Sequence, residues 1–487
     1  MKNIYKNLLL VSSLFIVFSC GNDDLEPTLA MAKSSETGIQ NAGDLASVLN
    51  GAYDRMSSSG YYARNIIIDG EVRSDNFFSN ANSGRTFSAS MDFSPNGYGP
   101  WGTIYGVIAI CNIVIQADHA SLEGDVNAIN HTVGQAYAIR GLAHFDLLKQ
   151  YGQHFVSGQG GKSSLGVPYV KTYRDPANLS PSRDSVESNV NNIVADIQQG
   201  ISMMNNTSTD AQYMNKGAAY AILARAANYY GSVDSGYYAA AASASKWVLD
   251  NWPKAAVGPS GYMASWYTDD AVNSLFEIAA SGTDNAGING VANIYRGPTY
   301  GDIRIVEGDG ADDVHDVYES TDIRYTANGM IGMEGGYLTM LGKWPSMDFT
   351  DNNKVIRVEE MHLIYAESML RAGDAATAKT YLNNVQAIRN ATLTDATVAN
   401  IMLERRREFF GEGHRFYDIA RSGIDMPLVN VFDQTYDDLT GSAPAAGSYR
   451  FAFPISLSER NANPNICLLY TSPSPRDRTR SRMPSSA

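Results

Sequence analysis

The stretch "IRVEEMHLIYAESMLRAGDAATAKTYLNNVQAIRNA", residues 356–391, predicts two consecutive helices joined by a short turn. Apolar residues recur at helical spacing on both sides of Gly373. Small residues such as Ala366 and Ala378 stand where two antiparallel helices would cross, and Tyr365 fills the gap beside them. The stretch therefore indicates an all-helical packing unit that buries its apolar face against neighbouring units.

Other stretches repeat this pattern, so that about four helix pairs are expected along the chain. They include residues 130–152, which end at the C-cap candidate Gly152, and the consecutive helices expected at 215–231 and 235–251. The pairs resemble tetratricopeptide units, but long insertions interrupt them; the main one, about 251–357, is rich in Gly, Tyr and Asp. The expected fold is mainly α: a tetratricopeptide-like scaffold whose loop and short-strand insertions carry the ligand surface.

The N-terminal part of this scaffold shows the helical period from Ala42 onward. Residues 60–100 are rich in Gly, Ser, Asn and aromatics and are expected to be loops. A helix is expected to start at Pro100, and a later helix is expected to be capped by Ser182 or Asp184.

The first 20 residues predict an exported, lipid-anchored protein. Lys2 and Lys6 precede an apolar run at 8–18, which is too short to span a bilayer but fits a signal peptide. Val17-Phe18-Ser19-Cys20 resembles the lipobox of bacterial lipoproteins, although Phe18 is bulkier than the usual residue. We therefore expect a signal peptide at 1–19 and, at 20–40, a lipidated Cys20 with its tether. The alternative is an ordinary signal peptide with an incidental cysteine.

The last residues differ abruptly in character from the rest. Residues 467–487 read "CLLYTSPSPRDRTRSRMPSSA", and their back-translation matches a sequencing-library adapter. We interpret this segment as a translated adapter artefact and exclude it from further reasoning. The alternative is a genuine disordered tail.

Net charge and cysteine usage exclude several classes of protein. The formal net charge is −14, and it becomes about −19 once residues 1–19 and 467–487, with their excess of basic residues, are removed. This balance disfavours binding to nucleic acid. Besides Cys20 and Cys467 only Cys111 remains, in an apolar run, so neither a disulfide framework nor a thiolate metal site is expected.

Several motifs, in one order along the chain, resemble the SusD/RagB family. They include "WGTIYGVIAICNIVI", "AYAIRGLAHFDLLKQYG", "GVPYV", "VIRVEEMHLIYAE", "ERRREFFGEGHRFYD" and "FPISLSERNANPN". The resemblance covers 41–466 and implies an N-terminal part of about 41–250 and a C-terminal RagB/SusD part of about 251–466. It implies a lipid-anchored outer-membrane protein, facing the cell exterior, that binds nutrients, mainly glycans, beside a SusC-like TonB-dependent transporter.

Candidate ligand residues lie in loops that mix aromatics with amide and charged side chains, because sugars stack on rings and hydrogen-bond to planar polar groups. The family resemblance carries over by region only. Our candidates are Trp101, Tyr98, Asp75, Asn76, Arg73, Tyr295, Arg296 and Trp344. Packing is an alternative role for Trp101, and it is the expected one for Trp344.

Nothing in the sequence singles out a catalytic site. The seven histidines are scattered, "GQGGKSS" at 158–164 lacks the first glycine of a phosphate loop, and no pair of carboxylates stands out. We interpret Glu404–Glu408 as arginine–carboxylate pairs that lock helices together. We expect no cofactor; Ca²⁺ in the acidic loop 307–322 is an alternative to a solvated loop, because the spacing of a calcium loop is missing.

Three functions that are not enzymatic remain open on this evidence, and a hydrolase comes last as a fourth. The first is glycan capture for a transporter, and the second is peptide or protein binding by a member of the same family. The third is a tetratricopeptide scaffold for envelope assembly, without a ligand. The long Gly/Tyr-rich insertions argue against the third.

Overall fold

The computed structural model describes residues 38–79, 83, 85–86, 99–205, 207–296, 301–307, 314–325, 329–427 and 444–466. The signal peptide, Cys20, the tether up to residue 37, Tyr98 and residues 467–487 lie outside this description, so the expectations for them stay predictions. Within it, no helix is long and apolar enough to cross a bilayer.

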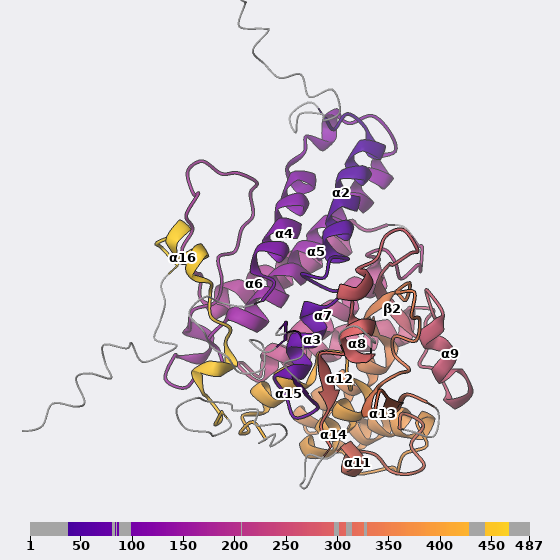
Figure 1. Ribbon diagram of the computed structural model, residues 1–487. Coiled ribbons are helices and arrows are strands. Elements are labelled where there is room, and N and C mark those ends of the chain that lie inside the picture. Colours follow the sequence, from indigo (N-terminus) through magenta and orange to yellow (C-terminus); the bar gives the residue numbers. More distant parts are fainter. Residues whose placement is uncertain are drawn as a thin grey trace, which may run out of the picture.

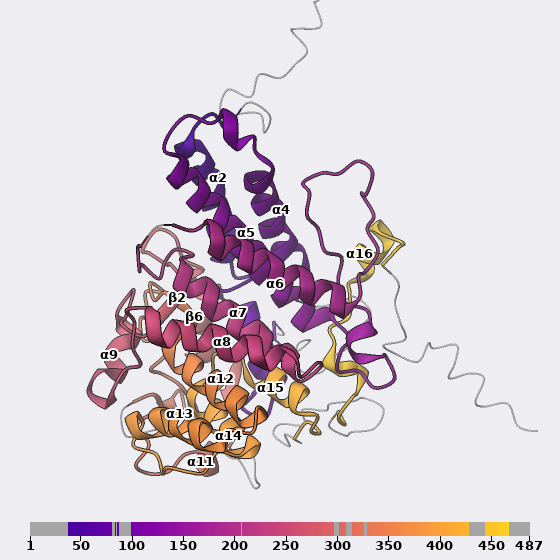
Figure 2. The same cartoon turned by 180° about the vertical axis from the view of Figure 1, so that it is seen from behind.

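Helices dominate the described residues, as the sequence predicted. Figures 1 and 2 show α5, α6, α7, α8, α12, α13 and α14 stacked in chain order, with α2 and α4 beside α5 at one end. The helices are α2 (Ala42–Met56), α3 (Asn65–Val72), α4 (Trp101–Gln116), α5 (Val126–Tyr151), α6 (Val186–Met203), α7 (Lys216–Gly231), α8 (Tyr237–Asn251), α9 (Tyr262–Tyr267), α10 (Val291–Arg296), α11 (Val314–Val317), α12 (Val358–Arg371), α13 (Ala375–Ile388), α14 (Val398–Glu408), α15 (Arg415–Ser422) and α16 (Leu457–Ala462).

Short strands occur mainly in the insertion between α8 and α12, where loops and strands were expected. They form three antiparallel two-stranded sheets, β1–β3, β2–β6 and β4–β5. Their bounds are β1 (Phe77–Ser79), β2 (Ser274–Ile278), β3 (Ile303–Ile305), β4 (Ile331–Glu334), β5 (Tyr337–Met340) and β6 (Asn353–Arg357). β1 lies in the N-terminal part of the chain and pairs with β3 of the insertion. Phe77 of β1 stands opposite Ile305 of β3, which follows it by more than 200 residues.

The predicted pair at 356–391 forms α12 and α13. Asp374 caps α13, because its side chain accepts a hydrogen bond from the backbone N–H of Thr377. Leu363 and Ala366 of α12 face Leu382 of α13 in a small apolar cluster of their own. This arrangement confirms the tetratricopeptide-like scaffold.

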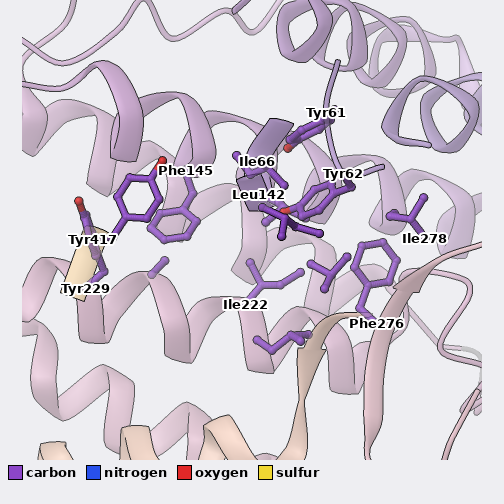
Figure 3. Packing of buried hydrophobic residues seen from close by; sticks show 14 of the residues in the cluster. Tyr61, Tyr62, Ile66, Leu142, Phe145, Ile222, Tyr229, Phe276, Ile278 and Tyr417 are labelled. Atoms are coloured by element: carbon purple, nitrogen blue, oxygen red, sulfur yellow. The ribbon is translucent and has the colours of Figure 1, made fainter. Parts of the chain in front are cut away.

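A larger apolar core runs from α2 to the C-terminal segments. Figure 3 shows its central part, where Tyr62, Leu142, Ile222 and Phe276 converge from four elements far apart in sequence. The core includes Cys111, which is fully buried, as expected for a small apolar residue.

Two local predictions were wrong. Residues 60–100 do not consist of loops alone, because they contain α3 and β1. The sequence of α3, "NIIIDGEV", lacks amphipathic periodicity because almost every residue of the helix is buried. The cap of α6 is Ser185 rather than Ser182 or Asp184; the Asp184 carboxylate instead accepts from the backbone N–H of Tyr169.

Glu408, at the C-terminal end of α14, is the centre of a buried ion-pair cluster. Its carboxylate accepts hydrogen bonds from Arg389 at 2.8 and 2.9 Å, from Arg357 at 2.9 Å and from Arg324 at 3.1 Å. All four side chains are at most 1% exposed. The cluster therefore joins α14 to the β6–α12 junction, to the end of α13 and to the 322–325 segment.

The other charged residues of α14 have partners of the same kind. Glu404 accepts from Arg324, Arg405 donates to Asp418 in α15, Arg406 pairs with Asp75, and Arg407 donates to the carbonyl oxygen of Val317. The interpretation of 404–408 as structural arginine–carboxylate pairs is confirmed. The last turns of α14 thus contact α11, α15, the 322–325 segment and the segment after α3.

Replacing Glu408 by Gln is expected to destabilise the fold by about 3–5 kcal/mol, because three buried arginines lose their shared counter-charge. Chemical denaturation of both proteins measures the difference. The matched control is Glu187→Gln, which removes an exposed pair with Lys162 and should cost less than about 1 kcal/mol. Equal effects of the two changes would contradict a central role for Glu408.

The carboxylate of Glu408 should also determine how the free energy of unfolding falls at acid pH. Burial raises the pKa of Glu408, but Arg389 and Arg357 outweigh burial and hold the pKa well below its usual 4.5. Its contribution is fully present above pH 4.5 and is lost as the pH falls toward the depressed value. The Glu408→Gln protein should therefore lose stability less steeply below pH 4.5 than the parent. If the free energies of unfolding of the two proteins fall in parallel below pH 4.5, Glu408 is not the titrating group.

Candidate ligand-binding site

Asp75 and Asn76, which the sequence nominated for ligand binding, lie inside the fold. Asp75 is 0% exposed and accepts two hydrogen bonds from Arg415, at 2.6 and 2.7 Å. Asn76 is 1% exposed and links Glu71 to Arg406 through its side-chain amide. The expected placement on a ligand surface is therefore corrected: both side chains attach the segment after α3 to α14 and α15.

Arg73 and Trp101 also serve packing in this structure. Arg73 donates to the carbonyl oxygen of Arg450, and its guanidinium lies over the rings of Phe416 and Phe453. Trp101 is 8% exposed at the start of α4 and meets the ring of Tyr151 edge to face. Trp101 thus has the alternative role that the sequence left open, the start of a packed helix. Tyr98 lies outside the described residues.

Three further candidates take part in packing at α10. They are Tyr295 and Arg296, which belong to α10, and Trp344. Tyr295 donates through its hydroxyl to the carbonyl oxygen of Gly411, and its ring stacks on Trp344 with centroids 5.4 Å apart. Arg296 donates to the carbonyl oxygens of Leu341 and Pro345. Trp344 is buried and donates to Asn353, which agrees with the packing role expected for it. These side chains hold the insertion together and leave its outer face to other residues.

The outer face of the insertion carries an aromatic side chain that the sequence analysis missed. Tyr337 is 44% exposed at the start of β5, and the guanidinium of Arg304 in β3 lies 4.6 Å from its ring centroid. The β4–β5 hairpin presents this tyrosine because Gly335 and Gly336 both have positive φ, as a tight two-residue turn requires. The adjacent glycines before Tyr337 were the available sequence signal.

Two polar groups beside this ring lack hydrogen-bond partners. The Nε of Arg304 is buried without an acceptor, and one carboxylate oxygen of Asp302 is buried without a donor. The other Asp302 oxygen accepts from Ser83 at 2.8 Å. Asp302 directly precedes β3 and is 1% exposed, and Arg304 is the central residue of β3. We refer to Asp302, Arg304 and Tyr337 as the Tyr337 platform.

The Tyr337 platform suits recognition of a hydroxyl-rich ligand. The exposed ring of Tyr337 offers a stacking surface, and the guanidinium of Arg304 beside it is a hydrogen-bond donor. Burial lowers the pKa of Arg304, but an arginine stays charged at neutral pH.

A cleft beside α10 differs in character from the Tyr337 platform, and Val291 and Ala292 of α10 are part of its lining. This cleft, of about 30 Å³, is lined by small apolar residues, the rings of Trp344 and Phe349, and the Asp351 carboxylate. Burial raises the pKa of Asp351, whose oxygens accept from the backbone and hydroxyl of Ser346. We call it the alanine cleft, after Ala63, Ala279, Ala280, Ala286 and Ala292.

The acidic segment that was considered for Ca²⁺ is partly accounted for by protein contacts. Asp322 is 0% exposed and pairs with Arg324 at 2.6 Å, so it belongs to the buried cluster around Glu408. Among the described residues, no group of three or more His, Cys, Asp or Glu side chains is placed to hold a metal ion.

The geometry defines a class of protein first: a stacked-helix scaffold that presents a binding surface on an insertion. Comparison with known protein families then identifies the family to which the chain belongs. Residues 24–227 match the family model described as "Starch-binding associating with outer membrane", and residues 340–467 match the model of the SusD family. The chain belongs to the SusD/RagB family, whose members are binding proteins.

Relatives and solved structures agree with this assignment. A SusD-like protein of Formosa agariphila is 30% identical over 130 residues, which cover 25% of this chain and 24% of that relative. The match thus spans about a quarter of the relative's length. A SusD superfamily protein of Bacteroides thetaiotaomicron is 25% identical, with a TM-score of 0.78 over 88% of this chain and 99% of that structure.

A surface glycan-binding protein of Bacteroides fluxus shares the fold at 22% identity and a TM-score of 0.69, over 87% of this chain and 97% of that structure.

Changing Asp75 to Ala is expected to destabilise the protein by about 3–5 kcal/mol, because Arg406 and Arg415 would be left buried without their partner. The measurement is the midpoint of denaturant unfolding. The control is Asp284→Ala, at an exposed carboxylate with no salt bridge, which should change stability by less than about 0.5 kcal/mol. Unchanged stability together with lost ligand binding would restore Asp75 as a ligand residue.

Proposed function

We propose that this protein is a cell-surface lipoprotein that captures a glycan and delivers it to a SusC-like TonB-dependent transporter in the outer membrane. The observation that carries the proposal is the Tyr337 platform, an exposed tyrosine ring beside the guanidinium of Arg304 on the outer face of the insertion. The matched family description, which names starch binding and the outer membrane, supports the ligand class and the location.

The proposed mechanism is capture and release without chemistry on the ligand. A sugar ring stacks on Tyr337, and its hydroxyls bond to the guanidinium of Arg304. Lipid attached to Cys20 keeps the binding protein close to its transporter, so that a modest affinity is enough for delivery. Because the scaffold is formed before the ligand arrives, little free energy is spent on ordering it.

Peptide or protein capture is the second candidate, and the alanine cleft favours it. A cleft with apolar walls and a half-buried carboxylate suits an aliphatic or amine-bearing group better than a sugar ring. A scaffold role without any ligand has no comparable observation in its support, because the insertion carries both surfaces.

Tyr337→Ala is expected to weaken glycan binding at least about tenfold, which corresponds to roughly 1.4 kcal/mol and is typical of a lost aromatic stacking partner. Calorimetric titration of starch oligosaccharides and a wider glycan panel measures the change. The control is Tyr267→Ala, which removes a tyrosine that is 64% exposed on α9.

A glycan that binds the parent and the Tyr267→Ala protein, but not the Tyr337→Ala protein, would establish the site. Binding of casein-derived peptides only, unaffected by Tyr337→Ala, would overturn glycan capture in favour of peptide uptake.

A further inference from the structure

The alanine cleft beside α10 contains a single charged side chain. Asp351 is the one ionisable residue among the described residues that line it. The polar residues of the lining, Ser57, Asn285 and Asn353, each have a hydrogen-bond partner inside the protein. A ligand that enters the cleft therefore meets one carboxylate in surroundings that are otherwise mostly apolar.

The Asp351 carboxylate is held in place and can still accept further hydrogen bonds. One oxygen accepts from the backbone N–H of Ser346 and the other from its hydroxyl, both at 2.7 Å. Since a carboxylate has about four acceptor positions, each oxygen can accept once more. Among the described residues no cation lies at ion-pair distance from Asp351; Arg296 attracts it from farther away and donates to the carbonyl oxygens of Leu341 and Pro345.

Partial burial favours a cationic partner for this carboxylate. Burial raises the pKa of Asp351, because the ionised form loses part of its hydration; Ser346 and Arg296 oppose the shift without cancelling it, and Asp348 adds to it. A cation bound beside the carboxylate would offset the lost hydration. The apolar walls strengthen this attraction, because little water is there to screen it.

Phe349 stands in the lining of the cleft in an unusual backbone conformation. Its φ is +67°, in the left-handed region that bulky residues rarely adopt. Strained residues of this kind concentrate at sites with a function. Phe349 precedes Asp351 by two residues, so the strain lies in the segment that carries the carboxylate.

The volume of the cleft limits the ligand to a slender group. The cleft measures about 30 Å³. Because about 10–15 Å³ holds one water molecule, there is room for roughly two groups of that size. An ammonium group and the methylene next to it fit this space, whereas a trimethylammonium group or a pyranose ring is too large.

We propose that the alanine cleft binds a primary ammonium group at the end of an unbranched aliphatic chain, with Asp351 as its counter-ion. The ammonium donates to the carboxylate, and the chain packs against the alanine methyl groups and the rings of Trp344 and Phe349. A lysine side chain of a peptide and a free aliphatic diamine both carry this group. The cleft shares no residue with the Tyr337 platform, so the inference does not depend on glycan capture.

NMR titration of the purified protein with n-butylammonium tests the proposal, with n-butanol and butyltrimethylammonium as matched probes. Butanol has nearly the same shape without the charge, and butyltrimethylammonium has the charge without the slender end. We expect n-butylammonium to bind at least about tenfold more tightly than either, because charge-assisted hydrogen bonds are the stronger ones. Nα-acetyl-lysine methylamide and cadaverine then distinguish a peptide source of the ammonium from a diamine.

Variants locate the binding in the cleft. Asp351→Asn removes the charge and is expected to weaken n-butylammonium binding at least about tenfold. Asp348→Asn is the matched control, because Asp348 is an exposed carboxylate outside the cleft. Ala286→Leu keeps Asp351 but fills the cleft from a half-buried position, and it should also abolish binding.

Competition separates this site from the Tyr337 platform. Saturating n-butylammonium should not displace a glycan bound at the platform, so failure of one proposal can be recognised without the other. Displacement would place the ammonium at the platform and overturn the inference.

Three further results would overturn the inference. The first is equal binding of n-butylammonium and n-butanol, which would show that charge is not recognised. The second is unchanged binding in both Asp351→Asn and Ala286→Leu, which would place the ammonium elsewhere. The third is a protein that binds none of the amines. If Asp351→Asn fails to fold, Ala286→Leu decides the location.

Discussion

The buried carboxylate of Glu408 sets the strongest constraint on this structure. Three arginines from separate segments converge on it, and it is the carboxylate that all three share, since their other partners differ: Asp322 and Glu404 for Arg324, Glu359 and Glu412 for Arg357, and Glu359 for Arg389. Buried ion pairs of this kind add little net free energy compared with apolar packing, but breaking one is costly. The cluster is therefore better understood as a device that allows only one arrangement of α14 against α12, α13 and the insertion.

The helical scaffold could be predicted from sequence because its signals are local. The period of α2, the cap of α13 and the small residues of the 356–391 pair are all visible within one or two turns. α3 escaped prediction because a helix buried on every side has no polar face to reveal its period. Segments that pack in the interior of a stack hide the pattern on which sequence reasoning depends.

The candidate site was harder to predict because composition does not distinguish a ligand loop from a buried polar junction. Asp75, Asn76 and Arg73 have the residue types of a sugar site, yet arginines and aromatic rings more than 300 residues away occupy them. The adjacent glycines before Tyr337 signal a hairpin in the sequence, but only the contact of β3 with β5 places Arg304 over the Tyr337 ring. Long-range contacts decide which polar residues remain available.

The distance along the chain between Arg406 and its partner Asn76 has a kinetic consequence. The two residues are 330 positions apart, and Arg415 meets Asp75 across 340. Closing loops of this length is slow compared with forming local helix pairs. Helices that form early therefore expose charged and apolar faces to solvent until their long-range partners are in place. During synthesis, Asp75 and Asn76 have no native arginine partner until α14 and α15 have emerged. We therefore expect this scaffold to fold cooperatively after most of the chain has been synthesised, and to depend on chaperones that cover the exposed faces of the incomplete chain.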